Sequence, residues 1–406
     1  MRTTLGAALL AGLVITVAPV SGAHAAPDTG ATGGYIVVLR DTASPSAVSA
    51  AHAQTHGVSV SHVYQHALRG YAAKMSATAA ARIAKDSRVL FVQPDGVVTA
   101  TAQTMPTGID RIDAELSPTA NIDGVDDRVD VDVAVIDTGI DLDHPDLNVY
   151  TAGAKNCSTG RNADDGNGHG THVAGTIGAL DNGDGVVGVA PGARVWPVRV
   201  LDNRGSGSWS DVICGIDYVT AHADEIEVAN MSLGGSGSDS TCGSNTDAMH
   251  EAICNSVAAG VTYVVAAGNS AANAATFVPA TYDEVITVSA LADFNGLPGG
   301  GASPTCRSDV DDTIADFSNY GADVDLMAPG VCILSTWKGG GYNTISGTSM
   351  ASPHAAGGAA LYKATHPTAS PATVKSALQA AGTTDYLWPA GDPDGIQEKL
   401  LNVAGF

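Results

Sequence analysis

The chain has 406 residues, which is enough for one large domain or two unequal ones. Its 42 acidic residues outnumber its 19 basic ones, and this balance argues against nucleic acid as a partner, because binding phosphates requires clustered positive charge. With 44% hydrophobic residues the chain can bury a large core, while its 48 glycines favour a protein with many tight loops over a helical bundle.

The first 25 residues have the pattern of a secretory signal peptide. Arg2 supplies a positive charge, an apolar run extends from Leu5 to Ala18, and Ala23-His24-Ala25 is a small-x-small cleavage site. The alternative is a membrane anchor, but the run is too short, and no later segment is long and apolar enough to span a bilayer. We therefore expect residues 1–25 to be a signal peptide and the protein to be secreted and extracellular.

Residues 26–101 predict a small α+β domain. After a polar linker, strand-like and helix-like segments follow in the order β-α-β-β-α-β, which is the ferredoxin-like pattern. The expected strands are 35–39, 58–64, 70–75, 89–93 and 97–99, and the expected helices end near residues 55 and 85. The small, polar stretch from Thr99 to Pro106 predicts an exposed cleavage region.

In residues 102–406, short apolar strands alternate with helical segments, which predicts βαβ units and a parallel sheet with helices on both faces. The expected strands are 131–136, 195–200, 228–232, 261–266 and 285–289, and helices are expected from near 169, at 210–222, at 247–259 and at about 349–365. In sheets of this kind the active site lies beyond the carboxyl ends of the strands.

The net charge of the chain changes sign at the same boundary, near residue 101. Residues 26–101 carry a net charge of +2, whereas residues 102–406 contain 38 acidic and 12 basic residues, a net charge of −26. Opposite signs predict that the two parts attract each other.

Six cysteines fit export to an oxidising compartment. They permit 15 pairings, and the sequence does not choose among them, although nearness favours Cys242 with Cys254 and Cys306 with Cys332, which leaves Cys157 with Cys214. A zinc site would require close pairs such as C-x-x-C, and the sequence has none.

Three segments contain residues that stability alone does not require. The strand Val133–Ile136 ends on Asp137, a carboxylate that is costly to bury unless donors surround it. His169 stands between two glycines at the start of a predicted helix, so that another chain can approach its imidazole. Ser349 begins a long apolar helix, where unpaired N–H groups point outward.

Each of these residues also has an ordinary interpretation. An aspartate can cap a turn, and most serines at helix starts are N-caps. His169 and His172 lie one helical turn apart and could bind a metal, but the H-E-x-x-H zinc signature requires a glutamate and a spacing of four.

Along the chain the three residues occur in the order Asp, His, Ser, and their side chains can act together in one reaction. The Ser349 hydroxyl needs a base, His169 can take its proton, and Asp137 can hold the imidazole in the required tautomer. Asn269, at the end of the strand Val261–Ala266, can donate to a tetrahedral oxyanion alongside the backbone N–H of Ser349.

The motifs VAVIDTGID, GHGTHVAGT, AAGN and GTSMASPHAAG resemble the subtilisin family, in the family's order, over residues 102–406. This resemblance implies a subtilisin-like three-layer α/β fold and a serine endopeptidase that acts through an acyl-enzyme, with Asp137, His169, Ser349 and Asn269 as the catalytic residues. Residues 26–101 resemble the family's inhibitory propeptide, which implies self-processing near Thr101 and a peptidase domain at 102–406.

The resemblance also implies a substrate groove. Ser232, Leu233 and Gly234 resemble the edge strand that pairs with the peptide backbone. Trp209 matches an aromatic wall of an outer pocket, although a core position is its ordinary interpretation. We expect protein and peptide substrates with broad, mainly apolar preferences, the chain's own propeptide as an inhibitor, no membrane association after signal removal, and a monomer.

A structural calcium ion is the cofactor that the resemblance implies, without a catalytic metal. The segment Leu180–Val186 resembles the family's calcium loop, and oxygen donors of this mixed kind suit a hard cation. The implied ligands are the side chains of Gln103, Asp146 and Asn182 and the carbonyls of Leu180, Asp184 and Val186. As a bare pattern, Asp, Asn and Gly more often form a turn.

Three other functions were weighed. A catalytically silent binding module would have lost one of the four catalytic residues, and all four are present. A calcium-binding structural protein explains the acidic loops but leaves GHGTH and GTSMASPH without a reason. A processing protease of the kexin type lines its groove with acids, and here the charge alone does not decide, because the whole of residues 102–406 is acidic.

Overall fold

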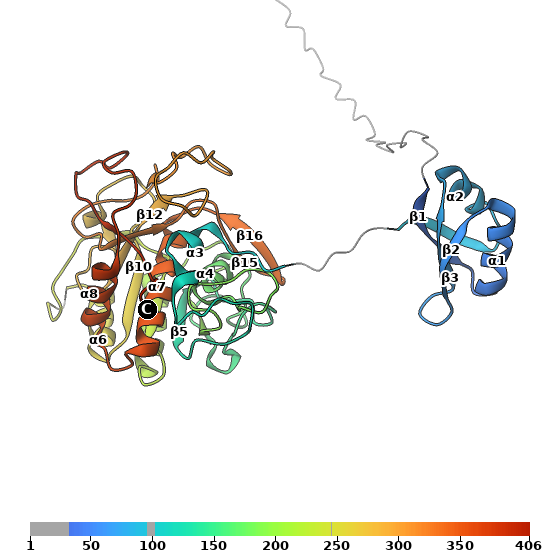
Figure 1. Cartoon of the computed structure of the whole chain (residues 1–406). Helices are drawn as coiled ribbons and strands as arrows, with labels where there is room; N and C mark the ends of the chain where they lie inside the picture. Colours follow the sequence, from blue (N-terminus) through green and yellow to red (C-terminus); the bar gives the residue numbers. More distant parts are fainter. Residues whose placement is uncertain (1–31, 96–101, 245) are drawn as a thin grey trace, which may run out of the picture. The chain divides into compact units, whose positions relative to one another are not determined.

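The computed structural model describes residues 32–95, 102–244 and 246–406 (Figure 1). They form two compact units, which divide between Ala100 and Thr101, and each unit is described by itself below. The predicted signal peptide at 1–25 and the predicted strand at 97–99 lie outside the described residues. Within the described residues, no helix has the length and apolar character needed to cross a membrane.

The N-terminal unit has the predicted β-α-β-β-α-β order. Its elements are β1 (Gly33–Leu39), α1 (Pro45–His56), β2 (Ser59–Tyr64), β3 (Gly70–Met75), α2 (Ala77–Ile83) and β4 (Val89–Pro94). The strands form one antiparallel sheet in the order β2-β3-β1-β4. Proline at the first position of α1 and left-handed Gly57 after its end set the limits of this helix.

The C-terminal unit is built on a nine-stranded sheet. Eight of its strands follow one another in the order β17-β14-β12-β10-β8-β5-β7-β6, and each of these neighbouring pairs is parallel. The ninth strand, β13, pairs antiparallel with β12. The strands are β5 (Asp132–Asp137), β6 (Lys155–Asn156), β7 (Arg194–Arg199), β8 (Val228–Met231), β10 (Thr262–Ala266), β12 (Ile286–Ala292), β13 (Thr313–Ile314), β14 (Leu326–Pro329) and β17 (Lys399–Leu400).

Helices cover both faces of this sheet. They are α3 (Thr107–Arg111), α4 (His169–Gly178), α5 (Trp209–Ala221), α6 (Ala248–Ala258), α7 (Thr348–Thr365) and α8 (Pro371–Ala381), with 3-10 turns at Ala114–Leu116, Thr151–Gly153 and Ala274–Thr276. Alternate residues of β5 show the layers: Val133 and Val135 pack in one core cluster with α4, α7 and α8, whereas Ala134 and Ile136 pack in another with α5 and α6. This is the predicted three-layer α/β architecture.

Several elements were not predicted from the sequence. They include the strands β14 and β17, the helix α8, the pair β9 (Gly235–Ser236) with β11 (Phe277–Val278), and the hairpin of β15 (Ile333–Trp337) with β16 (Gly341–Ile345). Most of them are too short to show a hydrophobic period, which is the signal that sequence analysis depends on.

Parallel strands bring their carboxyl ends to one edge of the sheet. There β5 ends at Asp137, β8 ends directly before Ser232, and β10 ends shortly before Asn269. The helices α4 and α7 begin at His169 and Thr348, respectively. The topology therefore gathers at one edge the polar residues that the sequence spreads over more than 200 positions.

Three disulfides join Cys157 to Cys214, Cys242 to Cys254 and Cys306 to Cys332. This is the pairing that nearness favours. The bridge from Cys157 closes the longest loop, with 57 residues of sequence separation, and this loop contains the whole of α4 and β7.

We predict that replacing both cysteines of a bridge by serine lowers the free energy of unfolding in the order of loop length. Cross-links remove more entropy from the unfolded chain when the loop is longer, so the loss should be roughly 4 kcal/mol for Cys157–Cys214 and roughly 3 kcal/mol for Cys242–Cys254. Guanidinium unfolding under non-reducing conditions measures both. Equal losses, or the reverse order, would show that the bridges do not act through loop closure.

Candidate active site

Asp137 is the last residue of β5, and its side chain is fully buried. The Thr138 backbone N–H donates to its Oδ1 at 2.7 Å. The His169 Nδ1 atom lies 2.8 Å from Oδ1 and 2.9 Å from Oδ2. Because a carboxylate can only accept, Nδ1 carries the proton, and Nε2 of the neutral imidazole is left as an acceptor.

His169 is the first residue of α4, and a tightly bonded loop fixes its position. Gly168 before it has φ 115°, and a Cβ there would lie 2.4 Å from the Trp337 ring, so only glycine fits. The buried Asp165 carboxylate accepts hydrogen bonds from the backbone N–H groups of Asn167, Gly168 and Thr171. Asp165 was not predicted as a site residue, because in the sequence it resembles any other aspartate of an acidic loop.

The pKa of His169 reflects two opposing effects. Burial of the ring lowers the pKa, but the Asp137 carboxylate, through its charge and its hydrogen bond, and then Asp165 outweigh it, so that the pKa is raised above its ordinary value of 6.5. With 25% of the side chain exposed, the imidazole is still open to a ligand.

Ser349 is the second residue of α7, and two reciprocal hydrogen bonds join it to Ser232. The Ser349 Oγ donates to the Ser232 carbonyl at 3.2 Å, and the Ser232 Oγ donates to the Ser349 carbonyl at 2.8 Å. The Ser349 carbonyl is free for this bond because the residue four positions on is Pro353, which has no N–H. The proline within α7 is thus tolerated because a strand-end serine replaces the missing donor.

A buried polar network supports this pair. Asn230, fully buried on β8, donates through Nδ2 to Ser232 Oγ at 2.9 Å, and its Oδ1 accepts from Ser352 Oγ at 2.7 Å. Neither Asn230 nor Ser352 was predicted as a site residue. Among the described residues, the side chains of Asn230 and Ser352 bond only to each other and to Ser232. These partners come together only when the strand and the helix are placed side by side, so no sign of them is visible in the sequence.

Asn269 follows β10, and its amide is oriented by Thr348. The backbone N–H and the hydroxyl of Thr348 donate to Asn269 Oδ1 at 2.8 Å and 3.0 Å. This leaves Nδ2 as a donor on the other side. A Cβ built on Gly347 would lie 3.6 Å both from Asn269 Nδ2 and from the Ser349 backbone nitrogen, so the two donors face one small volume.

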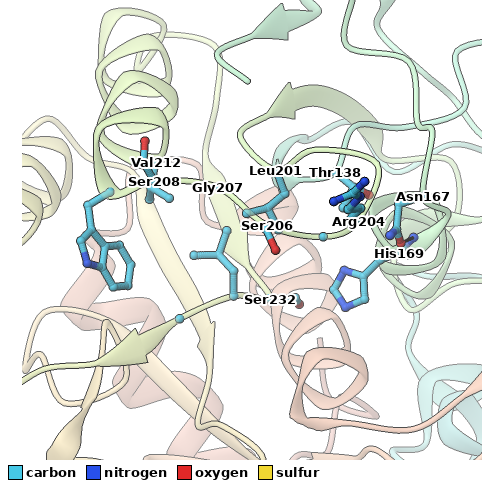
Figure 2. A pocket seen from close by; sticks show the side chains of 14 residues that line it. Thr138, Asn167, His169, Leu201, Arg204, Ser206, Gly207, Ser208, Val212 and Ser232 are labelled. Atoms are coloured by element: carbon cyan, nitrogen blue, oxygen red, sulfur yellow. Dashed lines mark hydrogen bonds between the residues drawn. The ribbon is translucent and has the colours of Figure 1, made fainter. Parts of the chain in front are cut away.

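A cavity of about 690 Å³ opens beside these residues (Figure 2). Its lining includes His169, the segment Arg204–Trp209 and the segment Ser232–Gly234, so it contains the predicted groove residues together with the imidazole. Trp209 is the first residue of α5, and 43% of it is exposed, so it is not a core residue. In the part of the chain that the structure describes, the backbone of Leu233 makes no hydrogen bond to another backbone group.

Comparison with known proteins identifies the family of this chain. The Subtilase family matches residues 129–398, and the family Peptidase inhibitor I9 matches residues 34–101. An "Extracellular serine proteinase" of a Thermus species is 42% identical over 344 residues, covering 82% of this chain and 76% of the relative. The chain belongs to the subtilase family.

Two further relatives agree with this assignment. Subtilisin DY from Bacillus licheniformis is 40% identical over 305 residues, which cover 74% of this subtilase and 98% of the relative. The crystal structure of a cold adapted subtilisin-like serine proteinase is 36% identical, covers 73% of this chain and 97% of that chain, and has a TM-score of 0.58. The protein is an extracellular serine endopeptidase, made as a self-processed precursor with an I9-type propeptide.

The six residues implied as calcium ligands gather on one side of the subtilase. Asp146, Asn182, Asp184 and Val186 line a cavity of about 490 Å³. The Asn182 Nδ2 donates to Asp146 Oδ1 at 3.0 Å, and the Leu180 N–H donates to the Asp146 carbonyl at 3.1 Å. The Gly183 N–H donates to Gln103 Oε1 at 2.7 Å, which ties the start of the segment 102–406 to this loop.

The Asp146 carboxylate is 2% exposed, and its hydrogen-bond donors are Asn182, the Val186 N–H and the Tyr342 hydroxyl. None of these donors carries a positive charge. Burial raises the pKa of Asp146 above its usual range. Carboxylate, amide and carbonyl oxygens around a buried, uncompensated acid are a donor set that fits a hard divalent cation.

Two other groups of ligand-type residues have structural explanations. His172 is buried, Ile333 O lies 2.9 Å from its Nε2, and burial lowers its pKa to about 3, so it stays neutral in the core. Cys242, His250, Cys254 and Glu284 lie close together, but the two cysteines are bonded to each other and offer no thiolate to a metal.

We predict that the His169 imidazole titrates above pH 6.5 and that Asp137→Asn moves its midpoint below 6.5. The substitution removes the negative charge that raises the pKa, and burial, which favours the neutral ring, then dominates. NMR of histidine-labelled protein would measure both midpoints. Asp224→Asn, an exposed change elsewhere, serves as the control. A midpoint that does not fall in Asp137→Asn would contradict this electrostatic explanation.

Proposed function

We propose that Ser349 is the nucleophile of this serine endopeptidase, that His169 is its general base, and that Asp137 orients and stabilises the imidazole. The observation that carries this proposal is the pairing of the buried Asp137 carboxylate with His169 Nδ1, which leaves Nε2 as an acceptor on the cavity that Ser232 also lines. Ser349 is bonded to that same Ser232.

The proposed reaction has two steps. His169 Nε2 takes the hydroxyl proton as Ser349 Oγ attacks the peptide carbonyl, and the imidazolium then protonates the leaving amine, which gives the acyl-enzyme. Water attacks the ester in the second step, again with His169 as the base, and Ser349 is released with its proton restored. Asp137 remains ionised throughout and stabilises each imidazolium.

The negative oxygen that forms in each step needs donors, and Asn269 Nδ2 and the Ser349 backbone N–H are well placed to supply them. Both face the space over Gly347, and Thr348 holds the Asn269 amide in this orientation before substrate arrives. A donor fixed in advance costs no reorganisation during the reaction.

Substrate binding by strand addition is supported by the backbone of Leu233, which bonds to no other backbone group of the described residues, and by its place in the same cavity lining as Arg204–Trp209. The glycines at 205, 207 and 234 leave room for a peptide backbone, while Leu233 and the half-exposed Trp209 give the cavity apolar walls. These features favour broad, mainly apolar specificity.

The precursor is proposed to comprise a signal peptide at 1–25, an inhibitory propeptide at 26–101 and a peptidase domain at 102–406, with the self-processing cut near Thr101. The division into compact units between Ala100 and Thr101 supports this boundary. The net charge of +2 on residues 26–101 complements the −26 of residues 102–406. We propose that the mature enzyme is a monomer.

We predict that the Ser349→Ala precursor stays at full length, whereas the wild type shortens to a form that begins near Ala102. Peptide hydrolysis should fall by about 10⁶-fold in Ser349→Ala, the loss that removal of the serine causes in a subtilisin. Asn269→Ala should lower kcat by about 10²- to 10³-fold. Gel electrophoresis with N-terminal sequencing, and a fluorogenic peptide assay, provide the measurements.

Ser376→Ala, at an exposed serine on α8, is the control and should behave as the wild type. Equal shortening of the wild type and Ser349→Ala would mean that another protease makes the cut. Hydrolysis that survives in Ser349→Ala would rule out the proposed nucleophile.

Calcium is proposed as a structural ion of this chain, held by Gln103, Asp146 and Asn182 through their side chains and by Leu180, Asp184 and Val186 through their carbonyls. Four of these residues line one cavity, while Gln103 is bonded to Gly183 and Leu180 is bonded to Asp146, and this arrangement supports the proposal. The ion would neutralise the buried Asp146 carboxylate and fix the start of the segment 102–406. It would take no part in the chemistry at Ser349.

We predict that chelating calcium lowers the melting temperature of the Ser349→Ala chain, and that adding Asp146→Ala lowers it to a similar value that calcium no longer changes. At 100 times its dissociation constant, an ion that binds only the folded state adds about 2.7 kcal/mol of stability. Differential scanning calorimetry of chains blocked by Ser349→Ala avoids self-digestion. Asp224→Ala, outside this loop, should keep the full response to calcium, and an unchanged response in Asp146→Ala would refute the site.

A further inference from the structure

Of the described residues that line the cavity beside His169, one, Arg204, is permanently charged, and none is acidic. This is notable in a segment with 38 acidic and 12 basic residues, where a chance lining would carry negative charge. In Figure 2, Arg204 lies toward the same end of the pocket as His169 and Asn167, whereas Ser208 and Val212 lie toward the other end.

The loop that carries Arg204 is held in place by its own backbone. The Asp202 Oδ1 accepts from the N–H groups of Arg204 at 2.8 Å and Ser206 at 3.1 Å, and the Asp202 N–H donates to the Ser206 carbonyl at 2.8 Å. The next residue, Asn203, is tied down on both sides, because the Asn167 Nδ2 donates to its carbonyl at 3.1 Å and Arg199 donates to its Oδ1 at 2.6 Å.

The Arg204 guanidinium itself has no hydrogen bond or ion pair within the described residues, although its backbone N–H is bonded. The pKa of the Asp202 carboxyl is lowered mainly by its backbone hydrogen bonds and to a smaller extent by the Arg204 charge. One oxygen of that carboxylate accepts from two backbone N–H groups. Asp165, the nearby buried acid, is satisfied by the hydroxyls and N–H groups of its own loop. The guanidinium is therefore available to a ligand in the groove.

We propose that Arg204 is a specificity-determining residue that favours an aspartate or glutamate side chain in the substrate, close to the scissile bond. This inference rests on the proposed groove and on His169 as the catalytic base. A guanidinium offers a planar, always charged donor pair that matches a carboxylate. A substrate acid would otherwise be repelled by the negative charge of residues 102–406, and Arg204 reverses that repulsion at one end of the groove.

The expected effect is modest and depends on salt. Exposed ion pairs contribute little, so kcat/KM for a peptide with Glu should exceed that for the same peptide with Gln by roughly 1.5- to 5-fold. Because Arg204 is exposed, this preference should decline toward one in about 1 M NaCl, where charges are screened within about 3 Å. The remaining positions should keep their apolar preferences.

The test uses the processed enzyme and a set of quenched fluorescent peptides that differ only by Glu, Gln or Lys. The variable residue is placed in turn at each of the four positions on either side of the scissile bond. The wild type should prefer Glu over Lys at one position within two residues of the cut. Arg204→Gln should abolish that preference, and Arg204→Glu should reverse it in favour of Lys.

The matched control is Arg161→Gln, at an exposed arginine that does not line the cavity, and its Glu-to-Lys ratio should equal that of the wild type. The inference is overturned if the wild type shows no acidic preference within two residues of the cut, or if Arg204→Glu leaves the ratio unchanged. In either case, continued cleavage of the Gln peptides by the wild type, and its loss in Ser349→Ala, would leave the proposed function intact.

Discussion

The bond between the Ser232 hydroxyl and the Ser349 carbonyl joins the central strand β8 to the start of the central helix α7. It exists because Pro353 cannot donate to that carbonyl, and because Ser232 stands at the first position beyond the strand. The same serine lines the cavity beside His169, and its carbonyl accepts a hydrogen bond from the Ser349 hydroxyl. One pair of residues thus fixes the proposed nucleophile against both the sheet and the groove.

Buried polar residues orient the side chains of His169 and Asn269. The buried Asp137 carboxylate pairs with His169 Nδ1, which raises the pKa of the imidazole and fixes its tautomer. The exposed part of the imidazole faces the cavity. Thr348 orients in a corresponding way the amide of Asn269, the proposed oxyanion donor. In both cases a residue without access to substrate orients one that has it, which is how a site keeps its geometry before substrate binds.

The sequence predicted the fold, and it singled out the proposed catalytic residues, because both leave local signals. A buried strand that ends on Asp137, glycines around His169 and a long apolar helix after Ser349 can each be read within ten residues. The partners Asp165, Asn230, Thr348 and Ser352 leave no such signal. Their polar groups acquire a function only when the topology brings β8, β10 and α7 together, so their importance could be found only in three dimensions. The short strands β14 and β17 were missed for a related reason, since they depend on neighbours rather than on their own period.

The most direct test of the account is covalent labelling of the full chain with a fluorophosphonate, which reacts with a serine only when a base activates it. We expect one adduct, located on the peptide that contains Ser349 by mass spectrometry, and we expect His169→Ala to abolish it while the chain remains folded. An adduct on another residue, or equal labelling in His169→Ala, would contradict the claim that His169 activates Ser349.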